Sequence, residues 1–411
     1  MSKKLLVIGY VWPEPTTTAA GCRMQQLLEA FKSFRYDITF ASTASKTEHS
    51  LDLAHVGVRE AAIKLNDSSF DEFVGLLAPD VVVFDRFMVE EQFGWRVTEY
   101  APNALRILNT EDLHALRKSR EEAHKKNQPF RIEDWKNHPM TLREVASIYR
   151  CDVSLMISTY EMDILQKEIQ IPSAMLLHLP FMVDVAESLQ DKWPQFDARN
   201  GFVSIGNGKH APNVDAVKVL KQEIWPRIRK QLPEAKIHIY GAYLPQQVNE
   251  MQSPNTGFYV HGWAEDVDLV LKNTKVLLAP IQFGAGIKGK LLDAMRTGTP
   301  SVTTTLGSEG MHGNLPWSGT ISDDWDSFAK AAVELHQEKE LWGKAQQNSF
   351  QILQTFYDKT VLQSQLKEQL QQTSKALEAH RAQNFIGKLL QHQTMSSTKF
   401  MAKWIAEKNK G

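Results

Sequence analysis

The residues that most clearly suggest chemistry lie in a glycine- and lysine-rich stretch over residues 280–300. Gly284 and Gly286 follow an apolar run and precede an amphipathic one, which predicts a strand, a turn and a helix. Glycines permit close backbone approach, and the first helical turn presents unpaired N–H groups. Lys288 and Lys290 add charge that opposes the helix dipole, and a bound anion would resolve this conflict. The pattern predicts a diphosphate site, and the alternative is a glycine turn with solvated lysines.

Two carboxylates accompany this stretch. Asp293 stands three residues after Lys290, on the same face of the helix predicted over residues 288–297. It can accept hydrogen bonds from the vicinal hydroxyls of a ribose, or it can pair with Lys290. Glu309 stands among small residues in a loop after another apolar run, where it can bind sugar or ribose hydroxyls or cap the next element. Both carboxylates therefore have a ligand role and a structural role open to them.

The elements that must position these residues follow from a repeated pattern. Short apolar runs rich in β-branched residues alternate with amphipathic stretches, and they predict strands buried on both faces of parallel sheets. The alternation of apolar and amphipathic runs stops over residues 177–200, a predicted hinge, and then resumes. We therefore predict an α/β chain of two doubly wound, Rossmann-like domains that face a cleft. The predicted strands cover residues 5–10, 37–41, 80–84, 105–108, 153–157, 202–205, 236–240, 257–260, 275–279 and 301–304.

The pattern also sets domain boundaries. We predict an N-terminal domain over residues 1–185, a second domain over residues 196–357 and a helical extension over residues 358–411. Near its end the extension carries an apolar stripe among lysines, made up of Phe400, Met401, Trp404 and Ile405. Such a helix can rest on an anionic membrane surface, at the inner membrane face, or dock on the N-terminal domain. We expect docking. Between the strands, residues 115–150 predict two charged helices.

Composition narrows the classes of function. The 411 residues carry a formal net charge of -1, so no overall field attracts nucleic acid and we expect no nucleic-acid partner. Cys22 and Cys151 are too few for a disulfide framework or a zinc site, and they fit a reducing compartment. No stretch approaches the ~18 uninterrupted apolar residues of a membrane span. We therefore expect a cytoplasmic protein.

Five motifs follow one another in the second half of the chain, at residues 206–217, 239–241, 260–266, 284–290 and 307–310. In order, spacing and strand context they resemble the donor domain of retaining glycosyltransferases of the family 4 type. The N-terminal half is similar, more loosely, to the acceptor domain of the same group through residues 13–23, 109–117 and 143–152. The resemblance implies the GT-B fold, a nucleotide diphosphate sugar as donor, transfer with retention, and no metal or other cofactor.

The resemblance also implies roles for individual residues. His114, Lys290 and Asp293 are expected to take part in catalysis, although a lone histidine can equally be structural and Asp112 suits a helix N-cap. The residues expected to bind the donor are Gly21, Arg23, Gly206, Lys209, Gly284, Gly286, Ile287, Lys288 and Glu309. The residues expected on the acceptor side are Asp85, Arg86, Asp112 and Arg117. The alternative to donor binding for Arg23 is that it begins the solvated face of a helix.

One position departs from the family pattern. The usual signature is Glu, seven residues, Glu, whereas Ala285 stands at the first position here and Asp293 at the second. The Gly-Ala-Gly-Ile-Lys form resembles a variant of that loop. We predict a glycosyltransferase, with a hexose the expected sugar, that acts on a carbohydrate, lipid-linked or small-molecule acceptor in polysaccharide or glycoconjugate biosynthesis. The alternative is a catalytically silent nucleotide-sugar-binding protein. A dinucleotide oxidoreductase would need Gly-x-Gly-x-x-Gly after the first strand, which is absent.

Overall fold

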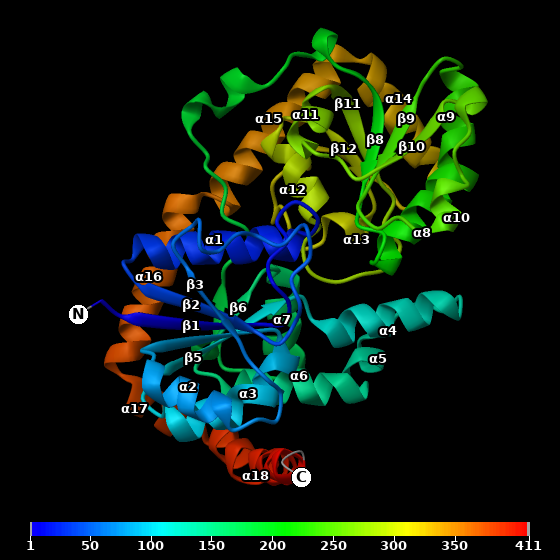
Figure 1. The fold of residues 1–411 in the computed structure, drawn as a ribbon. Coiled ribbons are helices and arrows are strands. Elements are labelled where there is room, and N and C mark those ends of the chain that lie inside the picture. The colour runs from blue at the N-terminus through cyan, green and yellow to red at the C-terminus, as the bar shows by residue number, and fades with distance from the viewer. Residues whose placement is uncertain (1, 409–411) are drawn as a thin grey trace.

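In the computed structural model, which describes residues 2–408, two parallel β-sheets organise the chain, one in each half (Figure 1). The first sheet has seven strands in the order β3-β2-β1-β4-β5-β6-β7, and the second has six in the order β10-β9-β8-β11-β12-β13. Every pairing within them is parallel. The predicted fold of two Rossmann-like domains with a helical C-terminal extension is confirmed.

The first sheet and its helices occupy residues 4–178. Their bounds are β1 (Lys4–Gly9), α1 (Ala19–Ser33), β2 (Asp37–Ser42), β3 (Arg59–Ala62), α2 (Ser69–Leu77), β4 (Val81–Asp85), α3 (Phe87–Tyr100), β5 (Leu105–Glu111), α4 (His114–Lys125), α5 (Ile132–Lys136), α6 (Pro139–Arg150), β6 (Val153–Met156), α7 (Thr159–Glu168) and β7 (Leu176–His178). The stretch predicted as two charged helices forms three, α4, α5 and α6.

The second sheet and its helices follow from residue 200. Their bounds are β8 (Asn200–Ile205), α8 (Ala211–Val219), α9 (Trp225–Gln231), β9 (Ile237–Tyr240), α10 (Gln246–Asn249), β10 (Phe258–Gly262), α11 (Val267–Lys272), β11 (Thr274–Ala279), α12 (Gly289–Arg296), β12 (Ser301–Thr303), α13 (Thr305–Ser308), β13 (Gly319–Ile321), α14 (Trp325–Gln337) and α15 (Lys339–Phe356). One π-helical turn, Leu220–Ile224, joins α8 to α9.

The central strands are buried on both faces, as their continuous hydrophobicity predicts. In β4 every residue from Val81 to Asp85 is buried, and β5 is buried along its whole length. One apolar cluster lies on each face of the first sheet, and two further clusters cover the second sheet. The two sheets therefore provide rigid frames whose loops carry the polar groups.

Three strands were not predicted, and all three lie at sheet edges. β3 and β7 border the first sheet, and β13 borders the second. β3 has the sequence Arg-Glu-Ala-Ala with mostly exposed residues, and β7 and β13 are three residues long. An edge strand needs less apolar sequence than a central one, because one side of it is not covered by another strand. β7 also takes Leu177 and His178 from the predicted hinge, so the connection between the sheets runs from residue 179 to residue 199.

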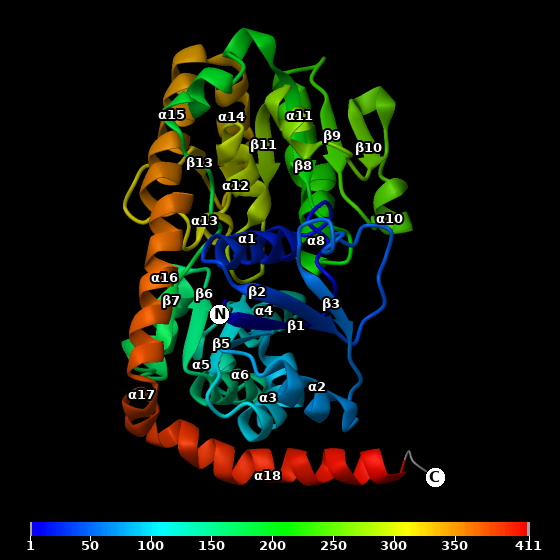
Figure 2. The same ribbon diagram turned by 60° about the vertical axis from the view of Figure 1, so that its left-hand side comes forward.

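The chain returns to the first domain at its C-terminal end (Figure 2). After α15, helix α16 (Lys359–Lys375) packs Leu362, Leu366 and Leu370 into an apolar cluster of the first sheet. Helices α17 (Leu377–Gln383) and α18 (Phe385–Lys408) follow, and α18 lies across α3 and α6. The extension therefore ties the second domain to the first.

The last helix turns its predicted apolar stripe away from the domain. Ala402 packs against Trp95, and the Lys399 ammonium lies 2.7 Å from the Glu99 carboxylate. Phe400, Met401 and Trp404 are 67%, 60% and 61% exposed. Among residues 2–408, no helix is long and apolar enough to cross a membrane.

Candidate functional site

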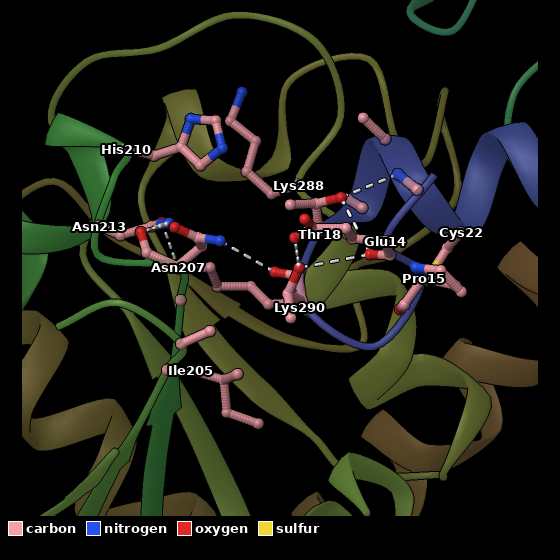
Figure 3. Close-up of a pocket in the computed structure, with 18 of the residues that line it drawn as sticks. Glu14, Pro15, Thr18, Cys22, Ile205, Asn207, His210, Asn213, Lys288 and Lys290 are labelled. Carbon is pink, nitrogen blue, oxygen red and sulfur yellow. Dashed lines mark hydrogen bonds between the residues drawn. The ribbon is translucent and has the colours of Figure 1, made fainter. Parts of the chain in front are cut away.

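A cleft of about 720 Å³ lies between the two domains, where the carboxyl ends of both sheets face each other. Doubly wound sheets bind ligands at this end of their strands, because the loops there are free of the sheet. Figure 3 shows the two walls: His210 and Asn213 of the second domain lie across from Glu14, Thr18 and Cys22 of the first. Both domains therefore contribute to one site.

The loop between β11 and α12 forms part of the wall, as the sequence predicts. Gly284 has a φ of 147° and Gly286 a φ of 63°, a region that residues with a side chain avoid. A Cβ on Gly286 would lie 2.9 Å from the Cβ of Asp112, and one on Gly289 would lie 2.7 Å from the Cβ of Ala19. The glycines thus let the loop and the start of α12 touch the first domain.

Lys288 and Lys290 lie half-buried in this wall at the start of α12. The Lys288 ammonium donates to the carbonyl of Gly286 at 2.8 Å. Burial lowers the pKa of Lys288 to about 8, and burial together with the nearby charge of Lys288 lowers the pKa of Lys290 to about 7. Two buried amines at a helix start favour a bound anion, because an anion would restore their ordinary protonation.

The loop after β8 lies beside the lysines. The Lys290 ammonium donates to Oδ1 of Asn213 at 2.7 Å, and Nδ2 of Asn213 donates to the carbonyl of Asn207. Gly206 makes room for this pair, because its Cβ would lie 2.8 Å from the Lys290 nitrogen. Lys209 also lines the cleft, but its ammonium lies 3.5 Å from the centre of the Tyr243 ring.

Asp293 and Ile287 flank the same helix start. Asp293 lines the cleft, and its Oδ1 lies 3.4 Å from Nη2 of Arg296, which itself pairs with Asp268. Burial raises the pKa of Asp293, although Arg296 opposes the shift. Ile287 lines the cleft as well but packs its side chain into the apolar cluster of α12. Asp293 is thus partnered by Arg296 rather than by Lys290.

His114 begins α4 on the opposite wall. Its Nε2 lies 3.4 Å from Oδ1 of Asp112, and its backbone N–H donates to the Glu144 carboxylate at 2.7 Å. Burial lowers the pKa of His114 to about 4, although Asp112 opposes the shift. The imidazole is therefore neutral near neutral pH. Asp112 also pairs with Arg117, which holds the pKa of Asp112 below its usual value against the effect of burial.

Asp85 and Arg86 lie at the carboxyl end of β4 and line the cleft. Arg86 has a φ of 76°, and its guanidinium lies 5.2 Å from the centre of the Tyr10 ring. The carboxylates of Asp85, Glu111 and Asp112 raise the pKa of Arg86, although burial opposes them. This part of the first domain combines a fixed positive charge with buried carboxylates.

Three residues predicted to bind the donor are engaged by other parts of the chain. Arg23 is completely buried, and it donates from Nε to Asn109 at 3.1 Å and from Nη1 to the carbonyl of Pro180 at 3.0 Å. Gly21 lines the cleft, but its missing Cβ makes room for the backbone of Glu14. Glu309 pairs with Arg120 of α4 through both oxygens, at 2.8 Å each. These positions serve packing between segments, which a local sequence pattern does not reveal.

The site also contains residues that sequence reasoning passed over. His210 and Asn213 lay inside the quoted motif at residues 206–217, and their polar side chains after a strand end were an available signal. On the other side, Glu14 accepts from Thr47 and Thr17, and the Tyr243 hydroxyl reaches it at 3.4 Å. No spacing in the sequence joins residues so far apart.

Comparisons with known proteins place this geometry in context. Residues 199–338 match the family described as glycosyl transferases group 1. A relative from Klebsiella pneumoniae, described as an uncharacterized 44.6 kDa protein in the cps region, is 27% identical over 234 residues. That alignment covers 53% of this chain and 56% of the relative, so the chain matches little more than half of that protein's length.

Solved structures resemble the whole chain at low identity. Sucrose-phosphate synthase from Thermosynechococcus elongatus has a TM-score of 0.68 at 14% identity, covering 91% of this chain and 100% of that one. HepE from Anabaena, in complex with UDP and glucose, has a TM-score of 0.65 at 10% identity, covering 90% and 99%. A glycosyltransferase from Rickettsia africae has a TM-score of 0.64 at 10% identity, covering 90% and 98%. The chain therefore has the GT-B fold, and residues 199–338 of its second domain match the model of the family described as glycosyl transferases group 1.

Proposed function

We propose that this protein transfers a sugar from a nucleotide diphosphate sugar to a carbohydrate or glycoconjugate acceptor, with retention and without a metal ion. The observation that carries the proposal is the placement of Lys288 and Lys290 at the start of α12, in the lining of a cleft between two domains. Residues 199–338, which include this wall, match the family described as glycosyl transferases group 1, and one solved structure of similar fold is described with UDP-glucose.

The proposed chemistry starts from the leaving group. As the bond between the sugar and the diphosphate breaks, negative charge builds on the diphosphate, and preorganised positive groups stabilise it. The lysine ammoniums and the N–H groups of the loop at residues 284–289 are such groups. Two cations can take the part that a divalent ion plays elsewhere, which is why we propose a metal-independent reaction.

The first domain supplies the opposite wall. The neutral imidazole of His114 can face developing positive charge on the sugar without repelling it, and it can accept a hydrogen bond from a sugar hydroxyl. Asp85, Arg86, Asp112 and Arg117 lie nearby and offer hydrogen bonds to an acceptor rich in hydroxyls. Asp293 is proposed to hold the donor ribose. We propose a hexose as the transferred sugar and a cytoplasmic reaction.

A second candidate function rests on Ala285. The carboxylate expected at this position is missing, and Ala285 packs against the apolar cluster of the first domain. A contact to the sugar hydroxyls is therefore absent from this position. The chain could then bind a nucleotide sugar without transferring it, and acceptor-dependent turnover separates the two candidates.

The test is a panel of nucleotide diphosphate sugars measured by thermal shift, followed by hydrolysis of the best ligand without acceptor. A ligand that binds raises the melting temperature by mass action. We expect one base and one sugar to be favoured, slow release of free sugar, and the same anomeric configuration in product and donor by NMR. If no sugar nucleotide raises the melting temperature, the proposal is wrong. Binding without hydrolysis or transfer to any glycan acceptor supports the silent binding protein.

A further inference from the structure

Helix α4 of the first domain reaches across the cleft to the glycine loop of the second. Arg120 donates from Nη1 to Oε1 and from Nη2 to Oε2 of Glu309, at 2.8 Å each, and from Nη1 to the carbonyl of Gly284 at 2.9 Å. The Arg120 side chain is buried, and the ring centres of Phe130 and Tyr160 lie 5.2 and 5.1 Å from its guanidinium. The guanidinium therefore has two aromatic rings beside it as well as its hydrogen bonds to Glu309 and Gly284.

A second contact comes from α7. Glu161 is completely buried, and its Oε1 accepts from the N–H of Gly286 at 2.7 Å and from the N–H of Leu113 at 3.2 Å. Its Oε2 has no hydrogen-bond partner among the described residues. One carboxyl oxygen thus holds both the glycine loop of the second domain and the start of α4 in the first.

The loop needs such partners. Gly284 and Gly286 both have positive φ, and the loop between β11 and α12 carries no regular backbone pairing. Glycine has many accessible conformations, so a glycine loop keeps one of them only where contacts from outside fix it. Here both contacts, to the carbonyl of Gly284 and to the N–H of Gly286, come from the other domain.

We propose that Arg120 and Glu161 are positioning residues, which hold the loop at residues 284–286 from the first domain in its anion-binding conformation. Glu309 is then a partner of Arg120 and not a ligand of the sugar. The inference rests on the proposed function for its catalytic consequence, but not for the state of the loop.

Hydrogen exchange in the ligand-free protein tests the loop directly. We expect Arg120→Ala and Glu161→Ala to speed amide exchange in the peptide that covers residues 283–289, while the rest of the second domain keeps its protection. The matched control is Arg143→Ala, because Arg143 forms a similar two-pronged pair with Glu91 on the surface, away from the cleft. Arg143→Ala should leave amide exchange in the peptide that covers residues 283–289 unchanged.

Conservative variants separate positioning from general stability. Burial raises the pKa of Glu161 to about 8, so the carboxyl is mostly protonated near neutral pH and glutamine resembles it closely. Glu161→Gln should therefore keep the protection that Glu161→Ala loses. Arg120→Lys keeps the charge but loses the two-pronged geometry, and it should lose protection in part.

Kinetics supply the second readout if the wild type transfers sugar. A loop displaced by about 1 Å can cost about 100-fold in rate. We expect Arg120→Ala to lower kcat by about that factor, while the Kd of the nucleotide diphosphate changes much less, because Lys288 and Lys290 remain. Unchanged exchange of residues 283–289 in both alanine variants would overturn the inference. Equal loss of protection from amide exchange in Glu161→Gln and Glu161→Ala would overturn it as well. A wild type that binds no sugar nucleotide would overturn the proposed function alone.

Discussion

The Lys290 ammonium donates a 2.7 Å hydrogen bond to Oδ1 of Asn213, and this bond joins the start of α12 to α8 across the cleft wall. Asn213 is held in turn by the carbonyl of Asn207, so the lysine points in one direction. An amide oxygen partners an ammonium without neutralising it. The charge of Lys290 therefore stays available to an anion in the cleft.

Replacing Lys290 with alanine tests that availability. We expect Lys290→Ala to weaken binding of a nucleotide diphosphate about 10- to 100-fold, because a hydrogen bond to a charged group contributes about 1.5–3 kcal/mol. Isothermal titration calorimetry measures the change. Lys344→Ala is the matched control, since Lys344 lies exposed on α15 and should bind like the wild type. Equal affinity in the wild type and Lys290→Ala would remove Lys290 from the site.

Binding of the donor should depend on pH. Burial, with a contribution from Lys288, lowers the pKa of Lys290 to about 7, so the free protein loses this proton as the pH rises through that value. An anionic ligand favours the protonated lysine. Affinity should therefore fall with rising pH, by at most about tenfold per pH unit for one linked proton.

The control for this pH dependence is Lys290→Arg, because a guanidinium stays protonated throughout. The ligand should be an intact nucleotide diphosphate sugar, whose diphosphate diester does not titrate near neutral pH. Calorimetry in a pH series should show a flatter profile for Lys290→Arg. A remaining step near the pKa of Lys288, about 8, is expected in both proteins. Profiles that coincide would contradict the assignment to Lys290.

A methyl group at Gly206 should disturb the hydrogen bond between Lys290 and Asn213. A Cβ there would lie 2.6 Å from Cγ of Asn213 and 2.8 Å from the Lys290 nitrogen. We expect Gly206→Ala to weaken nucleotide binding while the melting temperature changes little. Gly343→Ala serves as control, because nothing lies within 4 Å of its Cβ position on α15. That variant should bind normally and gain up to about 1 kcal/mol of stability.

The C-terminal extension should depend on one ion pair. Arg381 of α17 donates to both oxygens of Asp152 at 2.8 Å, and the Asp152 side chain is 2% exposed. We expect Arg381→Ala to lower the free energy of unfolding by about 2 kcal/mol, measured by denaturant titration. Lys388→Ala, on the exposed side of α18, should leave it unchanged.

Acid should reduce the difference in the free energy of unfolding between the wild type and Arg381→Ala. Arg381 and Arg106 lower the pKa of Asp152, although burial opposes them. A carboxylate with a lowered pKa contributes stability above its unfolded pKa and loses it as the pH falls through the folded value. The gap should therefore be constant near neutral pH and shrink on acidification. A gap that widens in acid would contradict this account.

Activity should not require a divalent ion. We expect transfer, once a donor and acceptor are found, to proceed at the same rate in EDTA as in added Mg²⁺ or Mn²⁺, because Lys288 and Lys290 supply the positive charge. Initial rates of product formation measure this. Loss of activity in EDTA that Mn²⁺ restores would show a metal-dependent reaction.

The sequence by itself determined the central architecture. The apolar runs of β1, β4, β8 and β11 predict buried parallel strands, because a strand covered on both faces must be apolar throughout. The sequence also predicts the turn with Gly284 and Gly286 and the lysines that follow it. The conformational freedom of glycine and the charge at a helix start are local properties. The unpredicted β3, β7 and β13 are edge strands, whose short or exposed sequences carry little of this signal.

Only the tertiary structure decided which side chains meet across the chain. Arg23 looked like a donor contact, but the packing of α1 on the first sheet buries it against Asn109 and Pro180. Glu309 was predicted to bind the donor, and the packing of the two domains gives both of its oxygens to Arg120. Such partners lie far apart in sequence, and their pairing depends on how the two domains pack. Local residue patterns contain no information about that packing, whereas they largely fix the strands, the turn and the helix start.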